Sequence, residues 1–398
     1  MTHVAPPDAL VSEDAPKQRH ARTRAKIRSD GGRRSVLLLV VVAMLVTIGL
    51  GAMLSASSVV SIRASADQFE LFTRQVLWVG LGFAALVVTT FIPYNWWRRI
   101  AFPLYAAVVV GLVITLAIGD RRGGATRWIE LGPVTLQIAE VAKFATLSLL
   151  AAVLTKKDAL LNDIRHVAVP VAAILGTVGL LLLAQPDFGS VLLIVTPAFI
   201  VLAASAVPLR FVFSMAGLGA MAMVVVAMSA DYRKTRLTAW LRPFDDAKGA
   251  GLQAVQSMVA LGTGGMFGVG LGQSRARWLW LPNAHTDFIF AIIGEETGFA
   301  GASIVILLFA MIGVAGVSIA FRAPDMYGRL LAIGIVSWLT VQALVNIGGV
   351  IGVVPITGVP LPFISSGGNA MVASLAAIGV LINISRSSDA AHASSEPA

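Results

Sequence analysis

The 398-residue sequence contains no cysteine and carries little charge. The absence of cysteine excludes disulfides, thiolate catalysis and sulfur-bound metal, and it leaves the redox compartment undetermined. Charged residues make up 13% of the chain and hydrophobic residues 57%, whereas a soluble protein of this size needs far more charge to cover its surface. We therefore predict an integral membrane protein that is held together by helix packing.

Long apolar runs indicate an all-α polytopic membrane protein. A spanning helix needs about 20 apolar residues, and the sequence offers about ten such stretches. They lie near residues 36–57, 76–93, 101–118, 138–155, 168–185, 188–206, 210–229, 287–320, 330–352 and 370–385. Residues 36–386 are thus expected to form one transmembrane domain.

The chain is polar on both sides of this domain. Residues 1–35 are basic and precede the first apolar run without the short hydrophobic core and cleavage site of a signal peptide. We interpret them as a disordered cytoplasmic tail, with attraction to anionic lipid as a secondary role. Residues 387–398 form a short C-terminal tail.

The distribution of positive charge predicts which loops face the cytoplasm. With the basic tail inside, the inner loops receive Arg98, Arg99, Lys156, Lys157, Arg165, Arg210, Arg322, Arg329 and Arg386. This bias places both termini in the cytoplasm. Residues 231–286 then form a long extracytoplasmic loop between helices 7 and 8, in which 252–261 predict a short amphipathic helix at the membrane surface. The cations of this loop suit an anionic lipid-linked ligand, although a solvated loop that touches lipid phosphates is the plainer interpretation.

Asp287 is the strongest candidate for a functional residue, because it opens the eighth apolar run after this polar loop. A carboxylate at the mouth of a membrane helix is costly to keep, which favours a functional role. Capping of the helix by Thr286 or Asp287 is the structural alternative, and the two roles are compatible. The preceding stretch from Trp278 to His285 suits a membrane–water boundary, where tryptophan rings settle.

Other polar residues are expected at the same outer level. Glu140 and Lys143 are three residues apart on the fourth helix and can pair, which suits a structural ion pair and a ligand contact equally. Arg127 beside Trp128 is typical of an outer-surface anchor. Asp187 follows a Gln-Pro break between two helices, and helix capping is its plainest explanation.

The segment from Val354 to Asn369 contains three prolines and a Ser-Ser-Gly-Gly run, which cannot continue a membrane helix. We predict an outer or re-entrant loop whose backbone is buried in protein or water. Gln342 and Asn346 lie one turn apart just before this loop and are expected to hydrogen-bond to a neighbouring helix.

Several of these residues belong to motifs that follow one another in a recognisable order. The motifs are Gly-Ala-Thr-Arg127-Trp128-Ile with Gln137-x-x-Glu140-x-x-Lys143, then Gln185-Pro-Asp187-Phe-Gly, then His285-Thr-Asp287-Phe-Ile-Phe-Ala-x-x-Gly-Glu295-Glu296, and finally Pro360-Leu-Pro-Phe-x-Ser365-x-Gly-Gly. Over about residues 36–386 the chain resembles the SEDS proteins, the family of FtsW and RodA. Its Asn-Ala-His-Thr-Asp and Ile-Gly-Glu-Glu stretches resemble the division branch more than the elongation branch. Two motifs depart from the family, since its Gln-Pro-Ser-Glu is Gln-Ile-Ala-Glu here and its Ser-Tyr-Gly-Gly is Ser-Ser-Gly-Gly.

The resemblance implies a peptidoglycan glycosyltransferase that polymerises lipid II at the outer face of the bacterial cytoplasmic membrane during cell division. It implies a class B penicillin-binding protein and other division proteins as partners, besides membrane lipid, and no nucleic acid. The family's essential aspartate falls on Asp287, its cavity glutamate and lysine on Glu140 and Lys143, and its loop arginine and tryptophan on Arg127 and Trp128. Further predicted substrate contacts are Asp187, His285 and Ser365.

The chemistry expected at Asp287 leaves two roles open. Joining two sugars needs a base for the acceptor hydroxyl, and a partly desolvated carboxylate can have its pKa raised into the working range. A divalent cation, Mg²⁺ or Mn²⁺, that bridges Asp287 to the diphosphate is the rival arrangement. A flippase of the lipid-linked precursor is the alternative function, although the sequence shows no clear similarity between its halves. A scaffold that only recruits partners is a third, and it predicts that Asp287 is dispensable.

Overall fold

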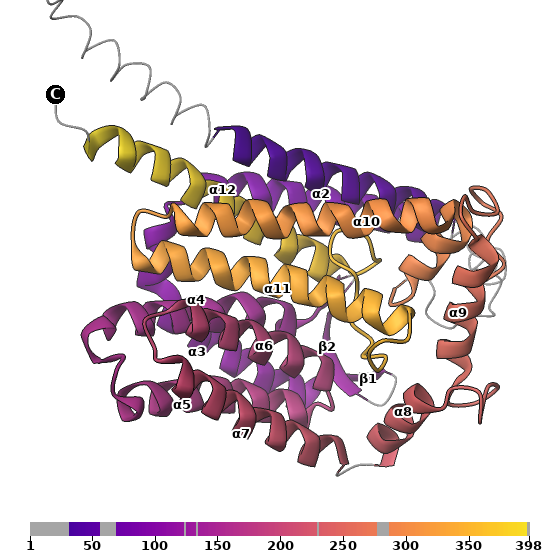
Figure 1. Cartoon of the computed structure of the whole chain (residues 1–398), viewed down its shortest axis with the longest axis horizontal. Helices are drawn as coiled ribbons and strands as arrows, with labels where there is room; N and C mark the ends of the chain where they lie inside the picture. The colour runs from indigo at the N-terminus through magenta and orange to yellow at the C-terminus, as the bar shows by residue number, and fades with distance from the viewer. Residues whose placement is uncertain are drawn as a thin grey trace, which may run out of the picture.

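The computed structural model describes residues 32–55, 69–122, 125–132, 134–228, 231–276 and 286–395. Most of the predicted basic tail and the stretch from Trp278 to His285 therefore lie outside the described residues. The described chain is a bundle of helices that run side by side along the long axis of the molecule (Figure 1).

Helices long and apolar enough to cross a membrane make up most of this bundle. Among the described residues nine qualify: Gly32–Ser55, α2 (Glu70–Phe91), α3 (Tyr94–Ile118), α4 (Ile138–Lys156), α5 (Ile164–Ala184), α7 (Leu209–Met228), α10 (Ile289–Phe321), α11 (Met326–Val350) and α12 (Gly368–Ser395). Helix α6 (Phe188–Ala204) is also apolar but has only 17 residues. These elements correspond to the predicted spans, so the predicted polytopic helical fold is confirmed.

Helix α11 lies in the middle of the bundle, whereas α7 lies at its edge (Figure 1). Most side chains of α11 are buried, including the large Tyr327 and Trp338. In contrast, α7 exposes large apolar side chains such as Leu218, Met221 and Val225. Apolar side chains exposed on a spanning helix face lipid tails, which are as apolar as leucine. We therefore assign α7 as a lipid-facing wall of the bundle.

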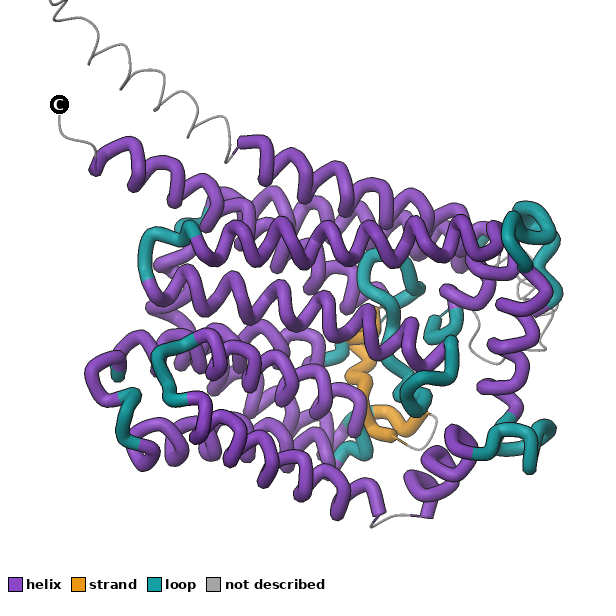
Figure 2. The backbone as a smooth tube through the Cα atoms, viewed as in Figure 1, coloured by secondary structure: helices purple, strands orange, loops and turns teal. Residues whose placement is uncertain are grey.

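A small antiparallel sheet lies at one end of the bundle (Figure 2). Its strands are β1 (Asp120–Arg122), β2 (Ala125–Leu131) and β3 (Val134–Leu136), in the order β1-β2-β3. The turn between β2 and β3 contains Gly132, whose φ of 65° glycine adopts without strain. The prediction did not include this sheet, because strands of three to seven residues carry too short an alternation to be recognised. We call this end the outer end, following the predicted topology.

The long loop between helices α7 and α10 also lies at the outer end and contains two helices, α8 (Asp231–Leu241) and α9 (Leu252–Gly264). Helix α9 confirms the short helix predicted over 252–261, while α8 was not predicted. Trp240 on α8 donates a hydrogen bond from its indole to the carbonyl of Gly352, just beyond α11 (2.9 Å). At the opposite end a 3₁₀ turn, Asp158–Leu160, joins α4 to α5.

Helix α10 is broken at Gly298, where φ is 69° and ψ is −168°. Two hydrogen bonds that a continuous helix would make across the break are replaced by four bonds to the segment after α9. These join Phe299 N to Gly265 O (2.8 Å), Ala300 N to Met266 O (3.1 Å), Val269 N to Glu295 O (3.0 Å) and Gly270 N to Glu296 O (3.1 Å). Gly265 and Val269 are four residues apart in one segment, and Glu295 and Phe299 are four apart in the other, which is the spacing of a helical hydrogen bond. The two interrupted helices thus satisfy each other's free backbone groups.

Glycines make this junction between α9 and α10 possible. A Cβ added at Gly264 would stand 2.1 Å from the carbonyl oxygen of Gly294, and one at Gly268 would stand 2.1 Å from that of Glu296. Gly298 is equally crowded, with the backbone nitrogen of Gly268 at 2.4 Å from the added atom. Both segments therefore carry a small residue every fourth position, the spacing that lets two helical backbones approach closely in a membrane.

Two adjacent buried carboxylates reinforce the junction. Glu295 accepts hydrogen bonds from the hydroxyl of Ser274 (2.5 Å) and the backbone N–H groups of Arg275 (3.0 Å) and Ala276 (3.1 Å). Glu296 accepts from the hydroxyl of Ser55 on the first helix. A buried carboxylate needs such donors to offset its lost hydration. Residues 274–276 of the long loop are consequently fixed to α10 eight residues beyond Asp287.

We predict that Gly264→Ala destabilises the protein by about 1–3 kcal/mol, because its methyl group collides with a backbone carbonyl. Gly262→Ala is the matched control on the same helix, since a Cβ at Gly262 meets no atom within 4 Å. The control should be neutral or stabilised by about 0.5–1 kcal/mol. Thermal unfolding of the two purified variants in one detergent measures the difference. Equal melting temperatures would mean that the close backbone approach does not stabilise the fold.

Candidate active site at the outer end

The first polar group of the outer end joins the sheet to α6. Arg127 on β2 places Nη2 3.4 Å from Oδ1 of Asp187 and donates a hydrogen bond to the carbonyl of Pro186 (3.0 Å). Asp187 accepts from the backbone N–H (3.3 Å) and the hydroxyl (2.6 Å) of Ser190. The predicted helix cap is therefore present, and an ion pair that was not predicted joins two of the candidate site residues.

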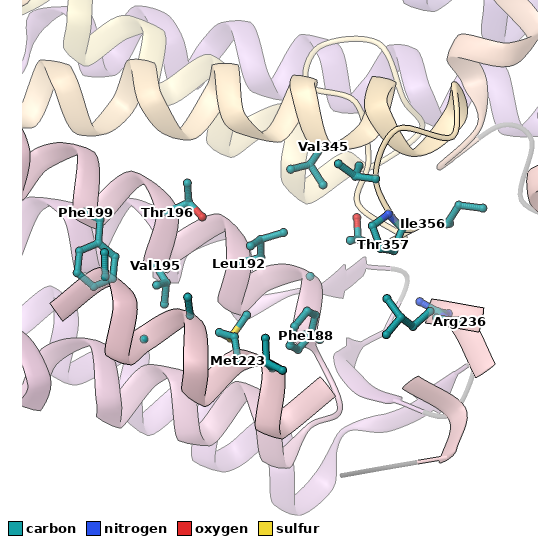
Figure 3. A pocket seen from close by; sticks show the side chains of 18 of the residues that line it. Phe188, Leu192, Val195, Thr196, Phe199, Met223, Arg236, Val345, Ile356 and Thr357 are labelled. Carbon is teal, nitrogen blue, oxygen red and sulfur yellow. The ribbon is translucent and has the colours of Figure 1, made fainter. Parts of the chain in front are cut away.

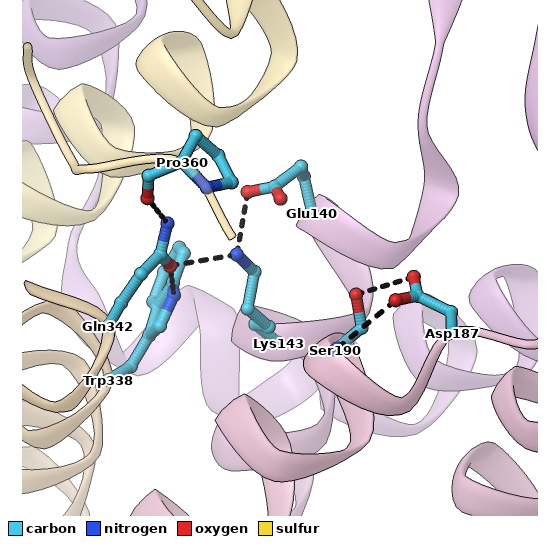
Figure 4. A network of polar contacts seen from close by, with 7 residues as sticks. All are labelled: Glu140, Lys143, Asp187, Ser190, Trp338, Gln342 and Pro360. Atoms are coloured by element: carbon cyan, nitrogen blue, oxygen red, sulfur yellow. Dashed lines mark hydrogen bonds and ion pairs between the residues drawn. The ribbon is translucent and has the colours of Figure 1, made fainter. Parts of the chain in front are cut away.

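The second polar group lies deeper, between α4, α11 and the loop after α11 (Figure 4). Lys143 Nζ stands 2.7 Å from Oε2 of Glu140 and donates to Oε1 of Gln342 (2.9 Å). The same Gln342 oxygen accepts from the indole N–H of Trp338 (2.8 Å), and the Gln342 amide donates to the carbonyl of Pro360 (2.8 Å). Lys143 also lies 5.0 Å from the centre of the Trp338 ring. The predicted Glu140–Lys143 pair and the predicted helix–helix bond of Gln342 are both confirmed.

Asp287 lies immediately before α10, beside the loop that follows α11. Asn346 on α11 donates through Nδ2 to the carbonyl of Asp287 (2.8 Å) and to that of Val359 (2.7 Å). The loop passes close to the carboxylate, since a Cβ added at Gly358 would stand 3.5 Å from Oδ2 of Asp287. The φ of Gly358 is 71°, which only glycine adopts readily. The carboxylate is thus placed between the start of α10 and this loop.

The surroundings of Asp287 tune its protonation. Burial raises the pKa of Asp287 from 3.8 to about 6, against the opposite effects of the charges on Arg127 and Arg236 and of a hydrogen bond with Thr286. Desolvation disfavours the charged carboxylate, and here it outweighs the two cations. A carboxyl group with a pKa near 6 can take up and release a proton at physiological pH, as a general base requires.

A cavity of about 1270 Å³ opens between α6, α7, α8 and the loop after α11 (Figure 3). Its walls on α6 and α7 are largely apolar, with Phe199 and Met223 among them. Arg127 and Arg236 also line it, and Figure 3 shows Arg236 at the opposite end of the cavity from Phe199. The cavity therefore combines a long apolar wall with a cationic end, and the same two arginines act on Asp287.

The remaining predicted site residues are Trp128, Ser365 and His285. Trp128 is half-buried on β2, where it pairs with Asp120 of β1. Ser365 is buried, and its hydroxyl accepts from the backbone N–H of Leu361 (2.8 Å), which closes a turn of the loop. His285 lies outside the described residues. Substrate contacts by these three residues stay predictions.

Two residues of the site were not assigned to it from the sequence. Arg236 was counted only as one cation of a basic loop, and the single available signal was that basic character. Asn346 was expected to contact a neighbouring helix, which is wrong, because its partners are the backbone carbonyls of Asp287 and Val359, outside the helices. No periodicity reveals which backbone carbonyl a buried amide will meet.

Breaking the Glu140–Lys143 pair is predicted to destabilise the protein, because each single change leaves a buried charge without its partner. Lys143 is 1% exposed and Glu140 is 3% exposed. Lys143→Met and Glu140→Gln should each lower the free energy of unfolding by about 3–5 kcal/mol. The double variant should regain most of that loss in thermal unfolding. A double variant as unstable as the sum of the singles would show that the two charges are not coupled.

Comparison with known proteins gives this geometry a context. The chain matches the model of the FtsW, RodA and SpoVE family, described as cell cycle proteins, over residues 35–390. It is 38% identical over 354 residues to the stage V sporulation protein E of Bacillus subtilis, which covers 88% of this chain and 96% of that protein. It is 36% identical over 355 residues to a probable peptidoglycan glycosyltransferase FtsW of Geobacter metallireducens, with 89% of this chain and 95% of that protein covered.

A solved structure shares the fold. One chain of a peptidoglycan synthase complex, described as coordinating polymerization and crosslinking, superposes with a TM-score of 0.72 at 28% sequence identity. The match covers 88% of this chain and 97% of that one. Since the family model spans nearly the whole helical bundle and the curated relatives match over almost their full length, this chain belongs to the FtsW, RodA and SpoVE family of multi-pass membrane proteins.

Proposed function

We propose that this protein is a peptidoglycan glycosyltransferase that polymerises lipid II, with Asp287 as the reacting carboxylate. The observation that carries the proposal is the cavity whose apolar walls end at Arg127 and Arg236, the two cations that act on a carboxylate of raised pKa. The name of the Geobacter relative, a probable peptidoglycan glycosyltransferase, supports the same activity.

The cavity suits a lipid-linked diphosphate. Its volume of about 1270 Å³ exceeds the roughly 300–1,000 Å³ of sites for drug-sized ligands. The apolar walls on α6 and α7 would receive the isoprenoid chain, and α7 faces the bilayer from which such a lipid enters. Guanidinium groups bind phosphate oxygens in bidentate fashion, so Arg127 and Arg236 would hold the diphosphate.

The reaction follows from this placement. Asp287, as the general base, takes the proton of the acceptor sugar hydroxyl while that oxygen forms a bond to the anomeric carbon of the donor. The bond from that carbon to the diphosphate oxygen breaks, and its electron pair leaves with the lipid diphosphate. The arginines stabilise the negative charge that develops there. The proton held by Asp287 then passes to solvent.

A divalent cation, Mg²⁺ or Mn²⁺, is the rival to a general base. Among the described residues no group of three or more His, Asp or Glu side chains could hold a metal ion. Asp287 could still contribute one oxygen to a cation held mainly by substrate phosphates, an arrangement that Mg²⁺ accepts. Bound in this way, the cation would neutralise the diphosphate, a task for which the two arginines are already placed.

We further propose the cellular setting. The structural likeness to a chain of a synthase complex supports a partner that crosslinks glycan strands, for which a class B penicillin-binding protein is our candidate, together with other division proteins. We assign the site to the outer face of the membrane at the division septum, with both chain termini in the cytoplasm. The positive charge of the inner loops supports this orientation, and the resemblance to the division branch supports the septal position.

Asp287→Asn should abolish polymerisation of lipid II by the purified protein, because asparagine keeps the shape of the side chain and loses the proton acceptor. The wild-type rate should rise with pH through about 6, since the acting form is the deprotonated carboxylate and burial raises its pKa to that value. Gel analysis of labelled glycan strands between pH 5 and 8 gives both measurements.

Two additions make this assay decisive. Repeating the assay with a chelator distinguishes the two roles of Asp287. If the chelator abolishes activity and added Mg²⁺ or Mn²⁺ restores it, Asp287 acts as a metal ligand and not as the general base. A flippase moves lipid II without lengthening it, so absence of glycan strands with the wild type and its partner would favour transport. Full turnover by folded Asp287→Asn would remove this residue from the mechanism.

The orientation of the site can be tested in this naturally cysteine-free chain. Gln273 is exposed at the outer end and Ala159 is exposed at the other, whereas the neighbouring Ser274 is buried against Glu295 and is unsuitable. Gln273→Cys should react with an impermeant thiol reagent added to intact spheroplasts, and Ala159→Cys should react only after lysis. The reverse pattern would place the site on the cytoplasmic face.

A further inference from the structure

Asn346 joins the two segments that enclose the carboxylate of Asp287. Both hydrogens of its amide are used, one by the carbonyl of Asp287 and one by that of Val359 (2.8 and 2.7 Å). Within the described protein its Oδ1 has no hydrogen-bond partner. The two carbonyls alone therefore orient the amide, since the opposite orientation would set oxygen against oxygen.

The element that carries Asn346 is well fixed. Asn346 is 5% exposed and lies on α11, the helix in the middle of the bundle (Figure 1). One turn earlier, Gln342 donates to the carbonyl of Pro360 (2.8 Å) and is itself held by Lys143. Consecutive loop residues, Val359 and Pro360, are thus each held by an amide of one rigid helix. Asn346 is the amide that also reaches Asp287.

A shift of the loop backbone at Val359 would change the surroundings of the Asp287 carboxylate. The preceding residue, Gly358, lies beside it, since an added Cβ there would be in van der Waals contact with Oδ2 of Asp287 at 3.5 Å. The amide also holds the backbone of Asp287 itself, at the point where the chain enters α10. Asn346 therefore sets the spacing between the acid residue and the loop beside its side chain.

We propose that Asn346 is a positioning residue for glycosyl transfer. By fixing the backbone of Asp287 against the loop at Val359, it keeps the carboxylate where it meets the acceptor hydroxyl. This inference rests on the proposed function of Asp287 and deepens it. A reacting group misplaced by about 1 Å can lose a factor of about 100 in rate. Losing the clamp should therefore lower kcat and leave substrate binding largely intact.

The test compares Asn346→Ala with Asn383→Ala. Asn383 is a matched control because its amide also joins separate segments, donating to the carbonyl of Thr90 (2.9 Å) and accepting from the N–H of Tyr94 (2.9 Å). It links α12 to the last turn of α2 and the first residue of α3, away from Asp287. Both changes remove two hydrogen bonds from the bundle, so both should lower the melting temperature.

For Asn346→Ala we expect kcat for lipid II polymerisation to fall about 10–100-fold with KM within about twofold of wild type. For Asn383→Ala we expect a similar loss of melting temperature with kcat within about twofold of wild type. Asn346→Thr, which keeps one donor and leaves a smaller void, replaces the alanine variant if that protein does not fold. The kcat of Asn346→Thr should be lower than that of Asn383→Ala, with a smaller loss than the one expected for Asn346→Ala.

Three results would overturn the inference. One is a folded Asn346 variant with wild-type kcat, another is a rise in KM without loss of kcat, and the third is an equal loss of kcat in Asn383→Ala. Asp287→Asn, assayed in parallel, separates this failure from failure of the proposed function. If Asp287→Asn is inactive while Asn346→Ala turns over normally, only the positioning role is wrong.

Discussion

A polypeptide that leaves a helix inside or beside a bilayer must find new partners for every N–H and C=O group it frees. The outer end of this protein is built around that requirement. The break at Gly298 is satisfied by the segment after α9, through bonds that two continuous helices would otherwise have made internally. The loop after α11 is satisfied by the amides of Gln342 and Asn346. Polar groups that are costly in an apolar helix are what stabilise the irregular backbone around the acid residue.

The charges of the site depend on one another in the same way. Asp187 stands 3.4 Å from Arg127 and so reduces the pull of that cation on Asp287. The charge on Arg127 still lowers the pKa of Asp287, but by less than burial raises it. A diphosphate bound to Arg127 and Arg236 would reduce their pull further.

The sequence predicted the elements that have their own periodicity or spacing. The spans, the short helix over 252–261 and the Glu140–Lys143 pair needed only hydrophobic runs or a three-residue separation on one helix. The sheet and α8 were not predicted, since neither is apolar nor long. Contacts between distant segments were also beyond reach, among them the pair of Arg127 with Asp187 and the bonds of Asn346. Such contacts depend on how loops return to the bundle, which no local pattern records.

The cavity has two walls of different character. One wall is the loop after α11, from Val354 to Thr357. Beyond these lining residues the loop is held by Gln342, which accepts from both Lys143 and Trp338 and donates to Pro360, so freeing the loop would break several buried bonds at once. Buried networks of this kind hold a single geometry, because each member left unsatisfied is costly. On the other side α7 offers apolar side chains to the cavity and to lipid. Dispersion and hydrophobic contacts are not directional, so this wall can receive chains of varied conformation. Such a cavity suits a ligand whose headgroup must be held in one position to react and whose tail needs only apolar surroundings.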